Sequence, residues 1–536
     1  MRPNVRLGGG EPAGNLIRMT ADAEHATGHT LVVDTTNGPV RGIDDGTVKS
    51  WKAIPYAAAP TGELRWRAPE PPQPWTEPRD ATRVGPVCPQ PTDPRIPLDL
   101  GAPQGDDCLT LNVWASSDTE AGAAKPVMVW VHGGAYIIGS SAQPLYHGRT
   151  LAGSGDAIIV TINYRLGGLG FLDLSSFGDR FATNVGVRDV LFALRWVRDN
   201  IAAFGGDPDR VTVFGESAGA GIVTTLLASP AAAGLFSAAV AQSSPATSIY
   251  DRERAGRVAN QFLDTLDMRT DETHHLPSVP ISVVNAAAQR VFDAVPSATP
   301  GTLAFAPIID GDIVPAHPVE LARQGRTHPV PLIIGTNKHE AALFRWMKSP
   351  LMPVTPQAIR AMFAAIAAEQ PGLQLPSEAQ IRAAYRGRPK IIGLGVARDI
   401  GFRMPSIWFA EGHSDVAPVY LYRFDFATPM LRLLRLGAAH ATELPYVWGN
   451  LVAGPRDPTF KLGGLKTGRA VSARMRSRWL NFAVDATPAD RHGGPHWRPY
   501  RKDDRATLVI DAQDTVLDDP DADVRSAWGD QVLSFR

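Results

Sequence analysis

The sequence predicts an α/β fold in which a mostly parallel central sheet carries helices on both faces. Short apolar stretches typical of buried strands recur along the chain, at residues 127–131, 157–163 and 211–214. Between the last two, residues 187–201 place apolar side chains on one face of an amphipathic helix. Alternation of strand, helix and strand is typical of parallel sheets that are covered on both sides.

The elements outside this central unit follow from turn signals and composition. Residues 31–56 alternate apolar runs with Asn-Gly and Asp-Gly turns, which predicts antiparallel strands and hairpins. The Pro-rich residues 60–78 predict an ordered loop. Further strands are expected at 106–114, 238–242, 330–335 and 419–426, and a late helix at 474–483.

The chain is expected to form one domain. Residues 1–28 are polar and Gly-rich and predict a loosely ordered tail, so the domain covers residues 29–536. Within it, residues 345–415 hold helical stretches broken by Pro and Gly. We expect this segment to be a helical insertion, or lid, over the mouth of the active site.

Composition and charge exclude several classes of partner. The 536 residues are 44% hydrophobic and 20% charged, with a net charge of −1. No long basic block or acidic tail points to nucleic acid or to an anionic membrane surface. No apolar run is long enough for a membrane span, and the first residues lack the apolar core of a secretory signal. A cytoplasmic location is therefore expected. The protein is expected to be a monomer or a homodimer.

A G-x-S-x-G motif at Gly215, Ser217 and Gly219 is the centre of the functional prediction. In a Gly-rich chain this pattern alone is weak evidence for a catalytic serine, because it also occurs by chance in structural turns. Here it lies between a predicted strand and a predicted helix, the context of the nucleophile elbow of α/β hydrolases. The glycines permit a sharp turn that exposes the serine hydroxyl at the helix N-terminus, where negative charge is stabilised. Ser217 is the predicted nucleophile.

The acid and the base that a serine nucleophile needs are expected later in the chain, in that order. Glu340 follows the strand at 330–335, so its carboxylate is expected at the edge of the sheet where Ser217 lies. Asp310 and Asp312 are rivals, but their sequence Ile-Asp-Gly-Asp is typical of a hairpin turn. Glu340 is the predicted acid.

Four histidines follow Glu340. His413 ends a predicted helix, and His492 and His496 lie in a polar loop rich in Gly and Pro. His440 is flanked by small residues in a loop that can bring an imidazole near a serine, although a lone loop histidine is usually only solvated. We predict His440 as the base, with Glu443 bracing its loop from behind.

The sequence His-Gly-Gly-Ala at residues 132–135 follows a buried strand and matches the oxyanion loop of esterases. The backbone N–H groups of Gly134, Ala135 and Ala218 are expected to converge on the developing oxyanion. The alternative is a Gly turn that serves packing alone. Apolar pocket walls are expected from four neighbouring side chains: Tyr136, Ile137, Leu343 and Phe344.

The motifs together resemble the type-B carboxylesterase family, which includes carboxylesterases, para-nitrobenzyl esterases and cholinesterases. The resemblance runs from about residue 30 to residue 500. Its motifs include IPYAAAPTGELRW, DDCLTLNVW, WVHGGAY, NYRLGGLGF, WVRDNIAAFGGDPDRVTVFGESAGA, IIGTNKHEAALF and HATELPYVWGN. The resemblance implies an α/β-hydrolase fold, the triad Ser217, Glu340 and His440, and a disulfide between Cys88 and Cys108. Such a bond sits awkwardly with a reducing cytosol.

Some residues depart from the family pattern. Ala135 replaces the third glycine of the oxyanion loop, and Ala341 follows Glu340 where glycine is usual. The loop between Cys88 and Cys108 has no aromatic residue, and Leu343 stands where cholinesterases place one. A choline ester is therefore an unfavourable substrate.

These observations predict a serine ester hydrolase that acts through an acyl-enzyme, without metal or cofactor, on small-molecule esters with short acyl or aromatic groups. Two alternatives stay open at this stage. One is a specialised hydrolase of carbamates, amides or thioesters with the same triad. The other is a non-catalytic binding or adhesion module on the same fold, although such relatives typically lose the serine.

Overall fold

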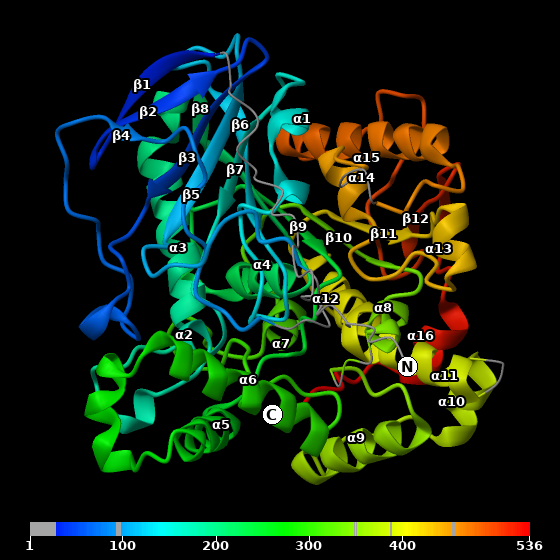
Figure 1. Ribbon diagram of the computed structural model, residues 1–536. Coiled ribbons are helices and arrows are strands. Elements are labelled where there is room, and N and C mark those ends of the chain that lie inside the picture. The colour runs from blue at the N-terminus through cyan, green and yellow to red at the C-terminus, as the bar shows by residue number, and fades with distance from the viewer. Residues whose placement is uncertain (1–27, 93–97, 348, 350, 386–388, 453–456) are drawn as a thin grey trace, which may run out of the picture.

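The computed structural model describes residues 28–92, 98–347, 349, 351–385, 389–452 and 457–536. The predicted tail at 1–28 therefore lies, except for its last residue, outside the described residues. The described part of the chain forms one 13-stranded sheet with strand order β1-β2-β3-β5-β7-β6-β8-β9-β10-β11-β12-β13, and β4 pairs with β2 (Figure 1).

The strands at the two ends of the sheet are antiparallel, and those from β7 to β12 are parallel to one another. The predicted, mostly parallel sheet is confirmed. The strand bounds are β1 His29–Thr35, β2 Gly38–Asp44, β3 Val48–Pro55, β4 Arg79–Asp80, β5 Thr110–Ser116, β6 Lys125–Val131, β7 Ile158–Ile162, β8 Gly206–Glu216, β9 Ala238–Gln242, β10 Leu332–Asn337, β11 Val419–Phe424, β12 Ala506–Ile510 and β13 Thr515–Asp518.

Helices cover both faces of the sheet and form two apolar cores. One core lies between the sheet and helices that include α3, α4 and α12, and the other lies between the sheet and α14 and α15 (Figure 1). The helix bounds are α1 Arg149–Ala152, α2 Gly167–Gly170, α3 Val185–Asn200, α4 Ala218–Ala228, α5 Arg252–Thr265, α6 Ile281–Ala298, α7 Pro318–Arg323, α8 Ala341–Trp346, α9 Pro356–Glu369, α10 Glu378–Tyr385, α11 Pro389–Arg398, α12 Met404–His413, α13 Pro429–Leu433, α14 Leu444–Trp448, α15 Leu465–Asp485 and α16 Ala522–Trp528.

Successive side chains of strand β6 show why the sheet has two buried faces. Val127, Val129 and Val131 pack into the core beneath α3 and α4, whereas Met128 and Trp130 pack beneath α14 and α15. All five side chains are buried. A strand that is covered on both faces has no polar side, which explains its continuous apolar sequence.

The segment 345–415 is largely helical, as its sequence predicts. It contains α9, α10, α11 and α12, and residues Asp399–Arg403 form one turn of π-helix directly before α12. The helix α12 packs on the sheet. The helices α9, α10 and α11 lie outside the sheet, although each adds buried apolar side chains to the same core (Figure 1).

Cys88 and Cys108 are both buried, and the structure holds them as free thiols, so the disulfide implied by the resemblance is not present. Burial and the neighbouring Cys108 raise the pKa of the Cys88 thiol well above its ordinary value. A thiol with a raised pKa is less often ionised, and it is therefore a weaker nucleophile than an ordinary cysteine.

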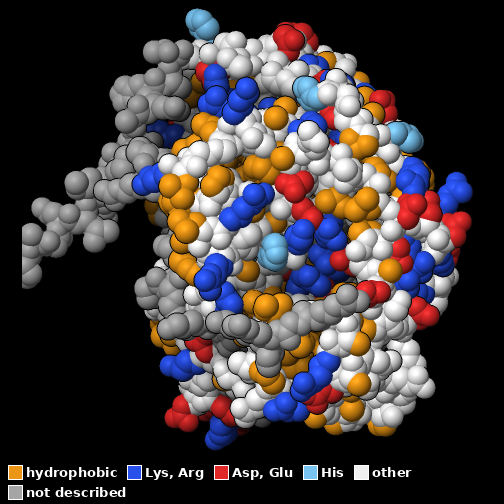
Figure 2. Space-filling view, turned by 90° about the vertical axis from the view of Figure 1, so that its right-hand side faces the viewer, with side chains coloured by type: hydrophobic (Ala, Val, Ile, Leu, Met, Phe, Trp, Pro, Cys, Tyr) orange, Lys and Arg blue, Asp and Glu red, His pale blue; other side chains and the backbone are white. Residues whose placement is uncertain are grey.

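Figure 2 shows basic and acidic side chains intermingled over the face of the molecule that it displays, which agrees with the net charge of −1. No helix within the described ranges is long and apolar enough to cross a membrane.

Candidate active site

The site lies at the carboxyl ends of the parallel strands. Strand β8 ends at Glu216 and helix α4 begins at Ala218, so Ser217 is the single residue between them. Its φ of 57° and ψ of −124° place it in a backbone conformation that L-residues rarely adopt. Such strain is typical of functional turns that the surrounding fold enforces.

The two glycines of the motif allow α4 to approach strand β6. A Cβ at Gly219 would lie 2.1 Å from the carbonyl oxygen of Val131, and a Cβ at Gly215 would lie 2.7 Å from the backbone of Gly219. Neither position has room for a side chain. The strand–turn–helix geometry therefore depends on glycine at both positions.

His440 connects Ser217 to Glu340. Its Nε2 lies 2.9 Å from the hydroxyl oxygen of Ser217, and its Nδ1 lies 2.6 Å from Oε2 of Glu340. The Nδ1–H group donates to the carboxylate, which leaves Nε2 to accept the hydrogen bond from the serine hydroxyl. The structure thus places the three residues selected from chain order in one hydrogen-bonded chain.

The Glu340 carboxylate is completely buried and held by two donors. Its Oε1 accepts hydrogen bonds from the backbone N–H of Asn337 and from the hydroxyl of Ser243, both at 2.6 Å. Asn337 ends strand β10 and Ser243 directly follows strand β9. Adjacent strands therefore fix the acid at the same edge of the sheet as Ser217.

Glu443 lies beneath the His440 loop, where the sequence predicts it. Its buried carboxylate accepts hydrogen bonds from the side-chain amides of Gln242, at 3.0 Å, and of Asn337. Gln242 in turn accepts a hydrogen bond from the indole of Trp479 at 3.2 Å. This buried network ties the histidine loop to strands β9 and β10 and to helix α15.

Sequence reasoning missed Glu216. Its buried Oε1 lies 3.2 Å from Nε2 of His440 and has no hydrogen-bond partner among the described residues. Burial raises the pKa of Glu216 to about 8. Burial alone would lower the pKa of His440, but the carboxylates of Glu216 and Glu340 raise it to about 9. Two groups this close titrate as a pair.

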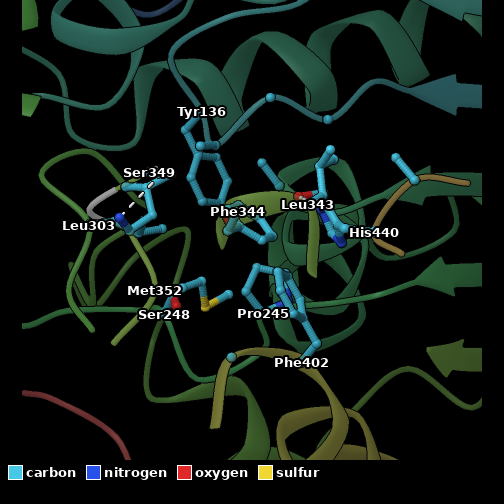
Figure 3. Close-up of a pocket in the computed structure, with 18 of the residues that line it drawn as sticks. Tyr136, Pro245, Ser248, Leu303, Leu343, Phe344, Ser349, Met352, Phe402 and His440 are labelled. Carbon is cyan, nitrogen blue, oxygen red and sulfur yellow. Dashed lines mark hydrogen bonds between the residues drawn. The ribbon is translucent and has the colours of Figure 1, made fainter. Parts of the chain in front are cut away.

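Sequence reasoning also missed Phe402, whose ring stacks on the imidazole of His440 at 4.5 Å between centroids. Phe344 packs against the same imidazole at 5.1 Å. Both rings lie beside His440 in Figure 3. Phe402 lies on the π-helical turn before α12, a feature that often marks functional sites. No local sequence pattern identifies such a turn.

The expected oxyanion loop lies beside Ser217. Gly134 and Ala135 have φ angles of 121° and 53°, and both line the same cavity as Ser217, as does Ala218. Among the described residues, the N–H groups of these three positions donate to no other backbone carbonyl. Ala135 has a left-handed conformation that suits glycine better, which explains why glycine is usual in this loop.

The cavity at Ser217 has a volume of about 330 Å³ and mostly apolar walls. Tyr136, Leu343 and Phe344 line it, as the sequence predicts (Figure 3). Ile137 does not line the cavity, so that expectation is wrong. The turn that leads from Gly134 to Ile138 directs the Ile137 side chain into the core against Gly167, and Ile138 lines the cavity instead.

The rival residues lie elsewhere. Asp310 accepts hydrogen bonds from Thr183 and Asn184, and the exposed Asp312 pairs with Arg188. The buried His413 is bonded through its ring nitrogens to Thr327 and to the carbonyl of Val330, and His492 and His496 are exposed.

Comparison with known proteins gives a consistent result. The profile of the carboxylesterase family matches residues 29–528. The para-nitrobenzyl esterase of Bacillus subtilis (strain 168) is 37% identical over 496 residues, which cover 92% of this chain and 97% of that protein. The phenmedipham hydrolase of Pseudarthrobacter oxydans is 32% identical, and the match covers 89% of this chain and 94% of that protein.

Solved structures agree with the sequence matches. A structure of a PNB esterase superposes with a TM-score of 0.82 at 36% identity, over 93% of this chain and 99% of that one. A carboxylesterase of Geobacillus stearothermophilus superposes with a TM-score of 0.80, also at 36% identity, over 93% of this chain and 100% of that one.

Proposed function

Because the chain belongs to the carboxylesterase family and is an ester hydrolase, we propose that Ser217, His440 and Glu340 carry out its reaction as nucleophile, general base and orienting acid. The hydrogen-bonded chain from Ser217 through His440 to Glu340 is the observation that carries this proposal. In the first half-reaction the Ser217 oxygen attacks the ester carbonyl carbon while Nε2 of His440 takes the hydroxyl proton.

The tetrahedral intermediate then breaks down. Its oxyanion accepts hydrogen bonds from the N–H groups of Gly134, Ala135 and Ala218, and each such donor is worth about 3 kcal/mol of the barrier. The carbon–oxygen bond to the alcohol breaks, and His440 gives its proton to the leaving alkoxide. Water attacks the remaining acyl-enzyme with His440 again as base, which releases the carboxylic acid and restores Ser217.

The preferred substrates in this proposal are esters with short acyl or aromatic groups. Apolar side chains form most of the cavity wall, and Phe344 and Phe402 present aromatic surfaces beside His440. The cavity lies at the low end of the volumes that bind small molecules. We also propose that residues 345–415 cover this cavity, because the side chains of Met352, Ile366 and Phe402 line it.

The test combines kinetics with covalent labelling. The wild-type protein is expected to hydrolyse p-nitrophenyl acetate and to gain the mass of one phosphonyl group from a fluorophosphonate. Ser217→Ala is expected to lose roughly 10⁴-fold or more in kcat and to resist labelling. Thr225→Ser is the control, because it keeps a hydroxyl group in the same helix and removes only a methyl group. This variant should still hydrolyse the ester and still be labelled. A labelled Ser217→Ala protein would contradict the proposal.

A further inference from the structure

The cavity at Ser217 extends away from the triad to a second end. In Figure 3, Leu303, Ser349 and Met352 lie on the side of the pocket opposite His440. Leu533, Ser534 and Phe535 also line the cavity. Phe535 lies next to Gly301, two residues before Leu303, so this C-terminal segment contributes to the wall near the second end. Figure 1 shows this red segment running from α16 toward α6 and past α9. We call Leu533 and Phe535 the end wall.

The end wall is built by a segment without helix or strand. Leu533 and Phe535 are buried, with exposed fractions of 1% and 6%, whereas Val532 and Ser534 are half-buried and Arg536 is exposed. This alternation is typical of extended chain, in which every second side chain points to the same side. The two large apolar side chains of the segment therefore point inward together.

Contacts from two helices fix the backbone of the segment. Arg254 of α5 donates from Nε to the carbonyl of Arg536 at 2.7 Å, and Glu369 of α9 accepts from the N–H of Arg536 at 2.9 Å. Gln370 donates to the carbonyl of Ser534 at 2.7 Å. Arg254 also pairs with Glu369, so the attachment points are themselves joined. The end wall therefore has a defined position.

The ring of Phe535 lies close to a cation and to a glycine. The guanidinium of Arg254, itself buried, lies 5.1 Å from the ring centroid. A Cβ at Gly301 would lie 3.5 Å from Phe535 and 2.9 Å from the sulfur of Met362. Because Gly301 also lines the cavity, the ring fills space that would otherwise extend the cavity.

We infer that Leu533 and Phe535 determine the greatest length of ester that the enzyme accepts. This inference rests on the proposed function, because it concerns the same cavity and nucleophile. A long apolar chain that passes Leu303 reaches the end wall, while an acetyl group never does. One methylene in an apolar pocket changes discrimination about tenfold or more. Shortening the wall therefore selectively favours the longer member of a substrate series.

The experiment measures kcat/KM for two series, p-nitrophenyl esters from acetate to decanoate and acetate esters of alcohols of increasing length. Phe535→Ala is expected to raise the ratio of kcat/KM for long substrates to kcat/KM for short substrates about tenfold or more in one series. Phe535→Trp is expected to lower the same ratio. Val532→Ala is the matched control, because it shortens a side chain of the same segment that does not line the cavity.

The outcomes separate the two proposals. Unchanged ratios in Phe535→Ala and Phe535→Trp, or an equal shift in Val532→Ala, would overturn the inference while leaving the esterase intact. A wild-type protein inactive on every ester would instead contradict the proposed function. Thermal unfolding identifies a variant that fails to fold. If Phe535→Ala fails to fold, Phe535→Leu replaces it, because leucine retains most of the apolar contact. This variant should also raise the ratio of long to short substrate. An unchanged ratio would overturn the inference.

Discussion

The carboxylate of Glu216 lies 3.2 Å from Nε2 of His440, on the nitrogen that also faces the hydroxyl of Ser217. A second carboxylate, Glu340, contacts the other ring nitrogen at 2.6 Å. The imidazole is therefore placed between two acids, and both raise its pKa. This arrangement stabilises the imidazolium formed during catalysis, and it also makes the resting imidazole harder to keep neutral.

The pH dependence of activity is expected to change in Glu216→Gln. Only neutral His440 can accept the serine proton, so activity falls as the pH drops through the pKa of this group. Glu216→Gln removes the carboxylate that titrates together with His440, so His440 should lose its proton at lower pH and the acidic limb of the kcat/KM profile should move to lower pH. The measurement is a profile from pH 5 to 10 with p-nitrophenyl acetate. A limb at the wild-type position would show that Glu216 does not influence His440.

The pH dependence of stability is expected to change in the same variant. The pKa of Glu216 is about 8 in the folded protein and ordinary in the unfolded chain. Between these values the folded state keeps a proton that the unfolded chain has released, so rising pH favours unfolding. Glu216→Gln lacks this group. Its unfolding temperature should therefore fall less than that of wild type between pH 5 and 8, as thermal scans in one buffer series can measure. Parallel curves would contradict a raised pKa.

Phe402→Leu is expected to lower kcat about tenfold and to change KM little. The substitution keeps an apolar side chain but removes the ring that stacks on His440, so the imidazole can leave the geometry needed for proton transfer. Steady-state kinetics on p-nitrophenyl acetate measures the effect. Phe409→Leu is the control, since Phe409 is buried in α12 and packs on His413 instead. Equal losses in both variants would indicate general destabilisation.

Two glycine substitutions are expected to act in opposite directions. Gly219→Ala places a Cβ 2.1 Å from the carbonyl oxygen of Val131, so α4 must move and stability should fall by about 3 kcal/mol, with loss of activity. Gly256→Ala in α5 meets no atom within 4 Å and should stabilise the protein by about 0.8 kcal/mol. Urea unfolding measures both changes. A tolerated alanine at position 219 would contradict the close approach of α4 to β6.

Thiol titration is expected to find two free cysteines. Cys88 and Cys108 are buried, so the native protein should react slowly with a disulfide reagent, and the unfolded protein should react with two equivalents without prior reduction. Dithiothreitol-treated protein provides the reference count. No reaction after unfolding, followed by two equivalents after reduction, would show the bond that the resemblance implies.

Much of the fold could be predicted because apolar runs and turn residues are local signals. The strand at 238–242 has the predicted bounds in β9, and the hairpins at 31–56 correspond to β1, β2 and β3. The predicted helix at 474–483 is the C-terminal half of the longer α15, whose ends lack clear caps in the sequence. Strand β12 was not predicted, because its five residues follow a charged, turn-rich stretch.

The positions of Ser217, Glu340 and His440 could be predicted because chain order and strand ends leave few candidate residues for each role. Their catalytic roles are the proposal made above. Ile137 shows the limit of this reasoning. Adjacent residues in a loop with left-handed turns point in directions that sequence does not reveal. Phe402 and Phe535 reach the cavity from distant segments and carry no motif. Only the packing of the whole chain brings them to Ser217.

The parallel strands β8, β9 and β10 hold the nucleophile and the acid, because Ser217, Ser243 and Glu340 all lie at or just beyond their carboxyl ends. Of the helices α9 to α11, which lie outside this sheet, α9 contributes Ile366 to the wall of the cavity, and Met352 and Phe402 from the same segment also line it. Chemistry and selectivity are thus supported by separate parts of the chain. Mild heating that loosens the outer helices would first yield an enzyme that still cleaves acetate but no longer distinguishes large esters from small ones.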